Sequence, residues 1–476
     1  MASYLIIVPL LGALAAFLMP SDRPRPWIVA GISIVHLALA GAVVRAGDVD
    51  LDSEWLRFDA LGRLVLIVIS TLFCICAVYC IGYLRLRPER PNKIFCTALL
   101  FFLGMTSLVA LAQHLTIMWV AMEATTLATA LLLYFNQNRS SLEATWKYLM
   151  IGSVGIALAL LGTLFLAYGA RLGMGVPTLL FPELVRHAEQ LPAPWVRTAF
   201  VFLLVGYGTK MGLAPLHTWK PDAYGEAPGV VGALLAGGMT TCAFLALLRV
   251  YRIADAAGQG VFARQLLVFF GLLSMATAAA FMIGQRDFKR LLAYSSVEHM
   301  GILVLAIGLG GAGIFAALLH TVNNALTKGV LFLAAGNIHR AYGSKRIENV
   351  TGALRRLPIS AGLFLAGFFA ITGSPPFGPF VSELSVLTTA IDGQRYAIGA
   401  TYLILLVIIF IGMGSTVLAV VQGEPPEDSE ERSFRESPFK TLPIVVSLAL
   451  VIMMGVWIPE WMSTLLHSAA RLLGGS

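Results

Sequence analysis

Apolar stretches of about 20 residues, the length that crosses about 30 Å of hydrocarbon, recur from one end of the chain to the other. The sequence is 58% hydrophobic and only 12% charged. A soluble domain cannot enclose so much apolar surface in a single core. The chain is therefore predicted to be an all-α polytopic membrane protein. Its first stretch lacks a basic start and a small-residue cleavage site, so we expect a span there and not a removed signal peptide.

Hydropathy predicts about fourteen transmembrane helices, at residues 2–19, 27–45, 61–84, 94–112, 115–135, 143–168, 197–216, 227–251, 263–283, 290–309, 313–337, 358–390, 397–421 and 441–466. We divide them into N-terminal helices (1–93), a five-helix block (94–251), a second five-helix block (263–421) and an acidic loop with the last helix (422–476). Two consecutive blocks of odd helix number must lie in opposite orientations. This is the inverted-repeat arrangement of many transporters.

Two of the predicted helices are interrupted by proline. Pro215 ends the helix that carries Lys210, and Pro375 and Pro376 precede Glu383 in the helix at 358–390. Proline removes a helical hydrogen bond, and the freed carbonyl groups are tolerated in a membrane only inside protein or beside a wet cavity. Each break is in the fourth helix of its block. We therefore expect both breaks near an ion path.

The loops indicate how the chain lies across the membrane. Basic residues gather at 85–93, 286–290 and 340–356, which fall on one side, and the opposite side receives the acidic loop with Asp48, Asp50, Asp52, Glu54 and Asp59. The positive-inside rule places the basic loops in the cytoplasm and both termini on the outer side of a membrane that we expect to be a bacterial inner membrane. The acidic loop at 423–440 departs from this bias and is expected to be flexible or to face a partner. The net charge of +7 then reflects topology and not nucleic-acid binding.

Cofactor motifs are not recognisable in the sequence. The five cysteines have no iron–sulfur spacing, and the GLGGAG stretch at 308–313 lacks the preceding strand of a dinucleotide-binding turn. We find no P-loop and no metal-ligand cluster. Cofactors are therefore not expected in this chain, and any redox chemistry is expected in partner subunits.

Four ionisable residues lie inside apolar stretches: Glu123, Lys210, Lys328 and Glu383. A charge near the bilayer centre costs at least about 2.5–3.5 kcal/mol, so such residues must be paired, hydrated or used. Acids and amines in sequence along a membrane protein are what a proton path requires. The structural alternatives are an ion pair between helices for Glu123 and lysine side chains that extend to the interface for Lys210 and Lys328.

Further polar residues are expected to support this path: His217, Lys220, Ser295, Ser296, His299, His320, Asn323 and Asn324. His217 and Lys220 follow the first break, where they form either a surface loop or a proton entry. His320, Asn323 and Asn324 are on or near the helical face of Lys328. For His299, a hydrogen-bonded core histidine is a serious alternative. Lys289 and Arg290 are interpreted as interface anchors, and His36, His114 and His467 as structural residues.

Four segments resemble the antiporter-like membrane subunits of respiratory complex I, multi-subunit sodium/proton antiporters and group 4 membrane-bound hydrogenases. They are KMGLAPLHTWKPDAYGEAPGVVGALLAG, FKRLLAYSSVEHMG, HTVNNALTKGVLFLAAG and GSPPFGPFVSELSVL, and they occur in the family's order and spacing. The combination of WKPDAYGEAPG, SSVEHMG and NNALTK looks most like the F-type subunit of hydrogenase-4 and formate hydrogenlyase. The resemblance extends over nearly the whole chain.

The resemblance implies fourteen helices, with two inverted five-helix repeats and broken helices 7 and 12. It also implies that Glu123 and Lys210 are the family's glutamate–lysine pair and that Lys328 and Glu383 are its later ionisable positions. Two departures stand out: Thr241 and Asn324 occupy positions where many relatives have lysine and histidine. A hydroxyl or an amide can hold a water wire but cannot carry the charge.

We therefore expect a proton-translocating subunit of a redox-driven complex, of the membrane-bound hydrogenase or formate hydrogenlyase type. Its partners would be other membrane and peripheral subunits that carry iron–sulfur clusters and, in a hydrogenase, nickel–iron, together with the lipid bilayer and protons. The alternatives are a subunit of a secondary sodium/proton or inorganic-carbon-linked transporter, a complex I subunit, or a structural membrane anchor.

Overall fold

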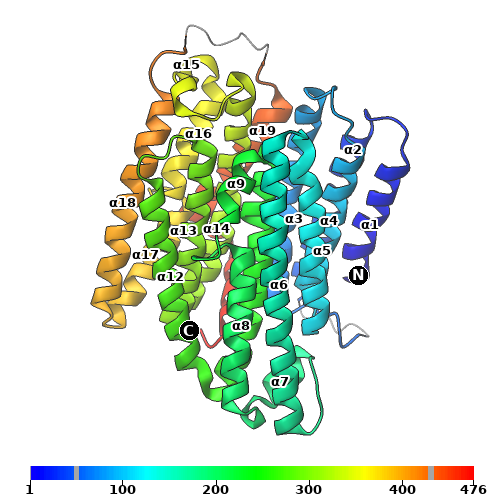
Figure 1. Cartoon of the computed structure of the whole chain (residues 1–476), viewed down its shortest axis with the longest axis vertical. Helices are drawn as coiled ribbons and strands as arrows, with labels where there is room; N and C mark the ends of the chain where they lie inside the picture. Colours follow the sequence, from blue (N-terminus) through cyan, green and yellow to red (C-terminus); the bar gives the residue numbers. More distant parts are fainter. Residues whose placement is uncertain (1, 48–52, 427–433, 476) are drawn as a thin grey trace.

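The computed structural model describes residues 2–47, 53–426 and 434–475 and is almost entirely helical (Figure 1). Within these ranges the β-structure amounts to three isolated bridges, one of which pairs Leu56 with Ala112. The all-α prediction is confirmed. The acidic residues Asp48, Asp50 and Asp52 and the middle of the second acidic loop, 427–433, lie outside the described residues.

The first half of the chain forms long helices joined by short loops. They are α1 (Ala2–Leu18), α2 (Arg25–Ala46), α3 (Ala60–Arg85), α4 (Lys93–Leu111), α5 (Leu115–Leu133), α6 (Arg139–Met174), the short α7 (Phe181–Arg186), α8 (Ala193–Met211), α9 (Trp219–Glu226) and α10 (Gly229–Ala233). The π-helix η3 (Leu234–Met239) joins α10 to α11 (Thr240–Ala254).

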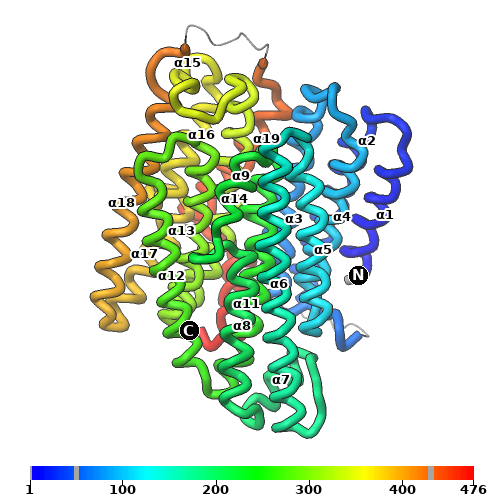
Figure 2. The backbone as a smooth tube through the Cα atoms, in the orientation of Figure 1, coloured from blue at the N-terminus to red at the C-terminus, as the bar shows by residue number. Residues whose placement is uncertain are grey.

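The second half continues in the same way. It contains α12 (Gly260–Met282), α13 (Phe288–Leu309), α14 (Ala312–Tyr342), the short α15 (Ala353–Arg356), α16 (Pro358–Ile371), α17 (Gly378–Asp392), α18 (Tyr396–Val421), α19 (Pro438–Val456) and α20 (Glu460–Arg471). Helices α1 and α2 form one flank of the bundle and α18 the opposite flank, while α9, α13 and α14 lie between them (Figure 2).

The described residues contain nine helices that are long and apolar enough to cross a membrane. Shorter apolar helices, such as α16, add to these. The number of about fourteen spans and the division into repeats therefore stay predictions. One predicted boundary is wrong. The last span was expected at 441–466, but α19 ends at Val456 and a separate helix, α20, begins at Glu460 after Pro459. Pro459 disfavours a helical conformation in the residue before it.

Both predicted helix breaks are present. Helix α8 ends at Met211 before Pro215, and α9 begins at Trp219. Helix α16 ends at Ile371, and α17 begins at Gly378 after Pro375 and Pro376. Each break divides the fourth helix of its predicted block. The two interruptions therefore come from local chemistry that the prolines dictate.

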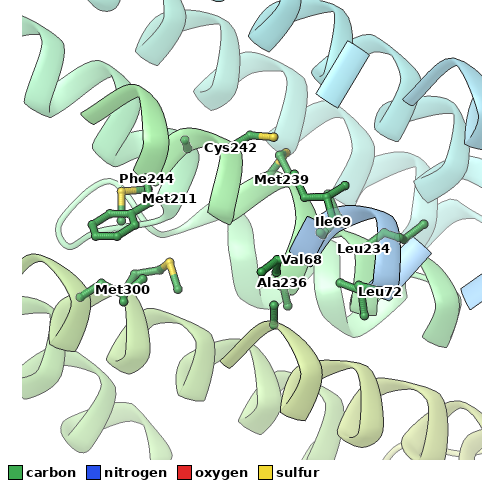
Figure 3. Packing of buried hydrophobic residues seen from close by; sticks show 14 of the residues in the cluster. Val68, Ile69, Leu72, Met211, Leu234, Ala236, Met239, Cys242, Phe244 and Met300 are labelled. Carbon is green, nitrogen blue, oxygen red and sulfur yellow. The ribbon is translucent and has the colours of Figure 1, made fainter. Parts of the chain in front are cut away.

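Part of the hydrophobic core lies where α3, η3 and α11 meet. Val68, Ile69 and Leu72 of α3 pack near Leu234, Ala236 and Met239 of the π-helix, and Met300 of α13 lies farther along, toward Met211 and Phe244 (Figure 3). A π-helix inserts an extra residue per turn, which changes the direction of the side chains that follow it. It directs Met239 toward Tyr148 of α6, whose hydroxyl lies 3.2 Å from the Met239 sulfur.

Small residues bring the helices of each half into close contact. A Cβ atom on Gly206 of α8 would lie 2.6 Å from the Ala159 backbone nitrogen of α6, and one on Gly155 would lie 2.7 Å from Thr209. The second half contains a similar close contact at glycine: a Cβ on Gly271 of α12 would lie 2.9 Å from the Gly301 carbonyl oxygen of α13. In lipid, the hydrophobic effect does not drive helices together. Helices associate there through close packing, which small residues at the interface permit.

The close α6–α8 contact predicts the effect of one methyl group. Gly206→Ala should lower the free energy of unfolding by about 1–3 kcal/mol, because the Cβ meets backbone that cannot move aside. The matched control is Gly31→Ala on α2, where a Cβ meets nothing within 4 Å. The control should be neutral or stabilising by up to about 1 kcal/mol. Denaturant unfolding of both variants in detergent micelles tests this, and equal stability of the two would contradict the close contact.

Candidate functional site

The predicted Glu123–Lys210 pair meets through a hydroxyl group. Thr126 on α5 donates a hydrogen bond from Oγ1 to Glu123 Oε2 at 3.1 Å, and the same oxygen accepts one from Lys210 Nζ of α8. Ser153 of α6 donates to Glu123 Oε1 at 3.5 Å. Lys210 is buried, whereas Glu123 is partly exposed. The acid and the amine are therefore connected by a group that can both give and accept a proton.

Two residues of α6 lie beside the Lys210 ammonium group. A Cβ on Gly152 would lie 3.8 Å from Lys210 Nζ, and the ammonium lies 5.3 Å from the centre of the Tyr148 ring. The Tyr148 hydroxyl is in turn 2.6 Å from Thr129 Oγ1. An aromatic face stabilises a desolvated cation. Tyr148 therefore gives Lys210 a partner that leaves its hydrogen-bonding capacity available.

A second cluster contains the other two lysines predicted for the proton path and one carboxylate. Lys220 of α9 donates to the Ser296 hydroxyl at 3.1 Å, and Lys328 of α14 donates to the Ser295 hydroxyl at 2.7 Å. The two serines are neighbours on α13. Glu298, one turn further along α13, interacts electrostatically with Lys328, and the two lysines repel each other. All five residues are buried. The acid thus interacts with Lys328, and the second amine, Lys220, lies close enough to repel the first.

A third cluster continues toward the second helix break. His299 Nδ1 of α13 lies 2.9 Å from His320 Nε2 of α14, and His320 Nδ1 lies 2.9 Å from the Ser382 hydroxyl of α17. Glu383 is the next residue and is also buried. Asn323 donates to the same Ser382 hydroxyl at 3.4 Å. Three helices are thus connected by a chain of groups that can pass a proton.

His299, His320 and Glu383 also form a possible metal-ligand set, because one ligand atom from each lies within 4.8 Å of the others. The hydrogen bonds argue against it. Both nitrogens of His320 are engaged, which leaves His299 Nε2 and Glu383 Oε1 as the unpartnered atoms. Two free ligand atoms are fewer than a zinc site needs. The arrangement suits proton transfer better than metal binding.

Three of the predicted supporting residues are buried near these clusters but are not joined to them by hydrogen bonds. The Thr241 hydroxyl donates back to the Gly237 carbonyl at 2.6 Å within its own helix. The Asn324 side-chain oxygen and His217 Nδ1 are buried without a partner. His217 and Lys220 nevertheless do not form a surface loop, because both side chains are at most 8% exposed.

Sequence reasoning missed the hydroxyls that join the charged groups. Thr126 and Ser382 are ordinary residues for a membrane helix, and only their positions, three residues after Glu123 and one before Glu383, could have drawn attention. The interpretation of Lys289 as an interface anchor is wrong. Its side chain is 1% exposed and donates to the carbonyl oxygens of Gly225 and Ala227 at the end of α9. Pro228 and Gly229 indicate a helix end there, but the sequence does not show that Lys289 lies against it.

The first break positions Lys220. Gly212 has a φ of +78°, and a Cβ there would lie 2.4 Å from Lys220 Cδ, so the lysine stem crosses the break against bare backbone. The freed amide of Ala214 donates to the Ser274 hydroxyl of α12 at 3.0 Å. At the second break, a Cβ on Gly373 would lie 2.2 Å from Glu383 Oε2. At both breaks, the missing side chain of a glycine thus leaves the space that a charged side chain occupies.

Comparison with known proteins gives independent evidence about the family of this chain. Residues 112–413 match the family described as NADH:quinone oxidoreductase/Mrp antiporter, TM. The chain is 34% identical over 481 residues to the hydrogenase-4 component F homolog of Methylacidiphilum infernorum (isolate V4), covering 97% of this chain and 98% of that protein. It is 30% identical over 422 residues to NADH-quinone oxidoreductase subunit N of Desulforudis audaxviator (strain MP104C), covering 84% and 82% of the two chains.

The fold has a counterpart among solved structures. A chain in the structure of the membrane-bound sulfane sulfur reductase, an archaeal respiratory membrane complex, superposes with a TM-score of 0.89 over 99% of this chain and 97% of that one. The two sequences are 22% identical. This likeness concerns the fold.

The path of Lys220 across the first break predicts a specific cost. Gly212→Ala should destabilise the protein through both its positive φ and the collision with the Lys220 side chain. Gly258→Ala isolates the first effect, because Gly258 has a φ of +72° and nothing within 4 Å of its Cβ position. In denaturant unfolding, Gly212→Ala should cost at least about 1 kcal/mol more than Gly258→Ala. Equal costs would mean that Lys220 does not lie against Gly212.

Proposed function

Because this chain belongs to the NADH:quinone oxidoreductase/Mrp antiporter membrane-subunit family, we propose that it is a proton-translocating membrane subunit of a redox-driven complex. The similarity to a protein named hydrogenase-4 component F homolog supports a complex of the group 4 hydrogenase or formate hydrogenlyase type. In this proposal the iron–sulfur and nickel–iron centres belong to partner subunits. The protein lies in a bacterial inner membrane with both termini outside.

The observation that carries the proposal is the bridge from the partly exposed Glu123 through the buried Thr126 to the buried Lys210. A structural ion pair would be served by direct contact between the two charges. A hydroxyl between them instead allows a proton to pass between the acid and the amine, because it can accept a proton on one side and release one on the other. Intramembrane acids, amines and histidines in succession are typical of proton relays.

We assign the steps along the bundle in the order of the three clusters. Redox energy released in the partners changes the Glu123–Lys210 arrangement, and Lys210 gives up its proton toward the second cluster. Lys220 and Lys328 repel each other there, and Lys328 also interacts with the Glu298 carboxylate, so a proton that arrives on one lysine disfavours the charge on the other. The His299–His320–Ser382 chain then leads toward Glu383.

The interval between Lys210 and Lys220 is occupied by aromatic side chains. The rings of Tyr148 and Trp219 lie 5.0 Å apart, and those of Trp219 and Tyr224 lie 5.9 Å apart. The Lys220 ammonium lies 5.7 Å from the centre of the Tyr224 ring, which completes the row of aromatic contacts. We propose that water enters this interval only when the first cluster rearranges. A dry interval would keep the proton from leaking between redox events.

Glu123→Gln tests the first step. The amide keeps the shape but cannot carry the charge, so proton translocation per electron pair should fall at least about tenfold, the effect of about 1.4 kcal/mol or more on the transfer step. The control is Glu143→Gln on α6, whose carboxylate pairs with Lys147 at the surface and should be dispensable. Proton uptake into inverted membrane vesicles during electron transfer provides the measurement. Unchanged coupling in Glu123→Gln would overturn the proposal.

Lys210→Met separates proton transfer from a purely structural role. We expect a complex that assembles and transfers electrons but moves fewer protons, because methionine fills the buried space without a titratable group. Subunit content by mass spectrometry and proton stoichiometry should be measured on the same preparation. Lost assembly with normal stoichiometry in the remaining complex would indicate an anchor. Co-purification without a redox subunit, with sodium-dependent proton transport, would indicate a secondary antiporter.

A further inference from the structure

Lys289 is a buried amine that the three clusters do not use. It is in the first turn of α13, and its side chain is 1% exposed. The ammonium donates to the Gly225 carbonyl oxygen at 2.9 Å and to the Ala227 carbonyl oxygen at 2.6 Å. Lysine is almost never fully buried unless it is paired, and here two backbone carbonyl groups of another helix are the partners.

The charged groups around Lys289 form a separate and more exposed network. Asp287 and Glu226 attract Lys289, but their ion pairs are with Lys345, at 3.5 Å and 2.5 Å. Lys345 repels Lys289 and donates to the Gly225 carbonyl oxygen at 3.3 Å. Ion pairs that reach solvent contribute little to stability. Lys289 therefore supplies the buried part of the attachment.

The partners of Lys289 are at the end of α9. This helix ends at Glu226, and Pro228, which follows shortly after, has no amide hydrogen. The carbonyl groups in the last turn of a helix have no donors within the helix, and the helix dipole favours a cation beside them. Lys289 thus provides donors from α13 that complete the end of α9.

Helices α9 and α13 hold each other by one lysine each. Lys220 of α9 donates to the Ser296 hydroxyl at 3.1 Å and to the Ser296 carbonyl oxygen at 3.3 Å. On α13, Ser296 is about two turns beyond Lys289. The break after Met211 separates α9 from α8, so a continuous helix does not fix the position of α9. Two separated contacts fix its register and its angle, whereas one contact would let it pivot.

Lys289 is not placed to pass a proton to the second cluster. Leu292 and Ala293 lie between Lys289 and Ser296 on the same side of α13, and both are buried. Neither side chain has a group that accepts or donates a proton. The contacts of Lys289 therefore suit a role in geometry and not a step of transfer.

We propose that Lys289 is a positioning residue of the proton relay, which holds the end of α9 against α13 and so keeps the Lys220 ammonium at Ser296. The inference rests on the proposed function, because Lys220 belongs to the second cluster of the relay. When Lys289 is lost, the end of α9 loses its buried attachment, and Lys220 samples positions away from Ser296.

The first test measures the position of α9 without using activity. A Cβ on Gly225 would lie 3.3 Å from Arg290 Cγ, so Gly225→Cys/Arg290→Cys places two thiols within reach of a disulfide in the oxidised, purified complex. Adding Lys289→Met should slow disulfide formation at least about threefold, because charge-assisted hydrogen bonds are lost. The control adds Arg286→Gln, which removes a 78% exposed side chain that pairs with Glu348. Equal rates with Lys289→Met and with the control would overturn the proposal.

The second test asks whether this position matters for translocation. In the assembled complex, Lys289→Met should lower the number of protons moved per electron pair at least about threefold, with electron transfer retained. Oxidation of Lys289→Met/Gly225→Cys/Arg290→Cys should restore most of this loss, because the disulfide replaces the contact but not the charge. The reference is the same cysteine pair with Lys289 present.

Two outcomes of the second test would overturn the proposal. Translocation that the disulfide does not restore would mean that Lys289 acts through its charge. Slower disulfide formation with normal translocation in Lys289→Met would make the contact structural only. Unchanged coupling in Glu123→Gln, together with slower disulfide formation in Lys289→Met, would overturn the proposed function and leave the α9–α13 contact established.

Discussion

The cost of leaving a charge or a polar backbone group unpartnered in hydrocarbon governs this structure. The lysines of the first two clusters each have a hydroxyl acceptor: Thr126 for Lys210, Ser296 for Lys220 and Ser295 for Lys328. The same constraint applies to the backbone at the first break, where Ser274 accepts the freed Ala214 amide. Polar groups at membrane depth are tolerated because neighbouring helices supply such partners. The close glycine-mediated packing of α6 on α8 and of α12 on α13 brings the helices near enough to do so.

Helix α13 connects the two halves of the polar system. Ser295, Ser296, Glu298 and His299 occupy little more than one turn, so they point in different directions around the helix axis. One serine contacts α9 of the first block and the other contacts α14 of the second, while His299 leads toward α17 through His320. A change in the position of α13 would therefore affect both lysine contacts at once.

The features that sequence could predict are those with a strong local cause. Proline at 215 and at 375–376 predicts the breaks, and the rarity of charge in apolar stretches indicates Glu123, Lys210, Lys328 and Glu383. The hydroxyl partners could not be found in the same way, because serine and threonine are common in membrane helices and become important only through tertiary packing. The π-helix at Leu234–Met239 has no proline to indicate it. Lys289 was misassigned because its partners are backbone carbonyls of another helix.

The Thr126 hydroxyl carries one proton and has a direction: in this structure its hydrogen points to Glu123 and its lone pair faces Lys210. When a proton passes from Glu123 to Lys210, it hops onto Thr126 from the acid while the original hydrogen leaves to the amine, so the hydroxyl ends in the orientation seen here. It must then turn back before a second proton can follow the same route. In the proposed mechanism, such a bridge delivers single protons separated by a reorientation, so it sets the number of protons per event as well as their route.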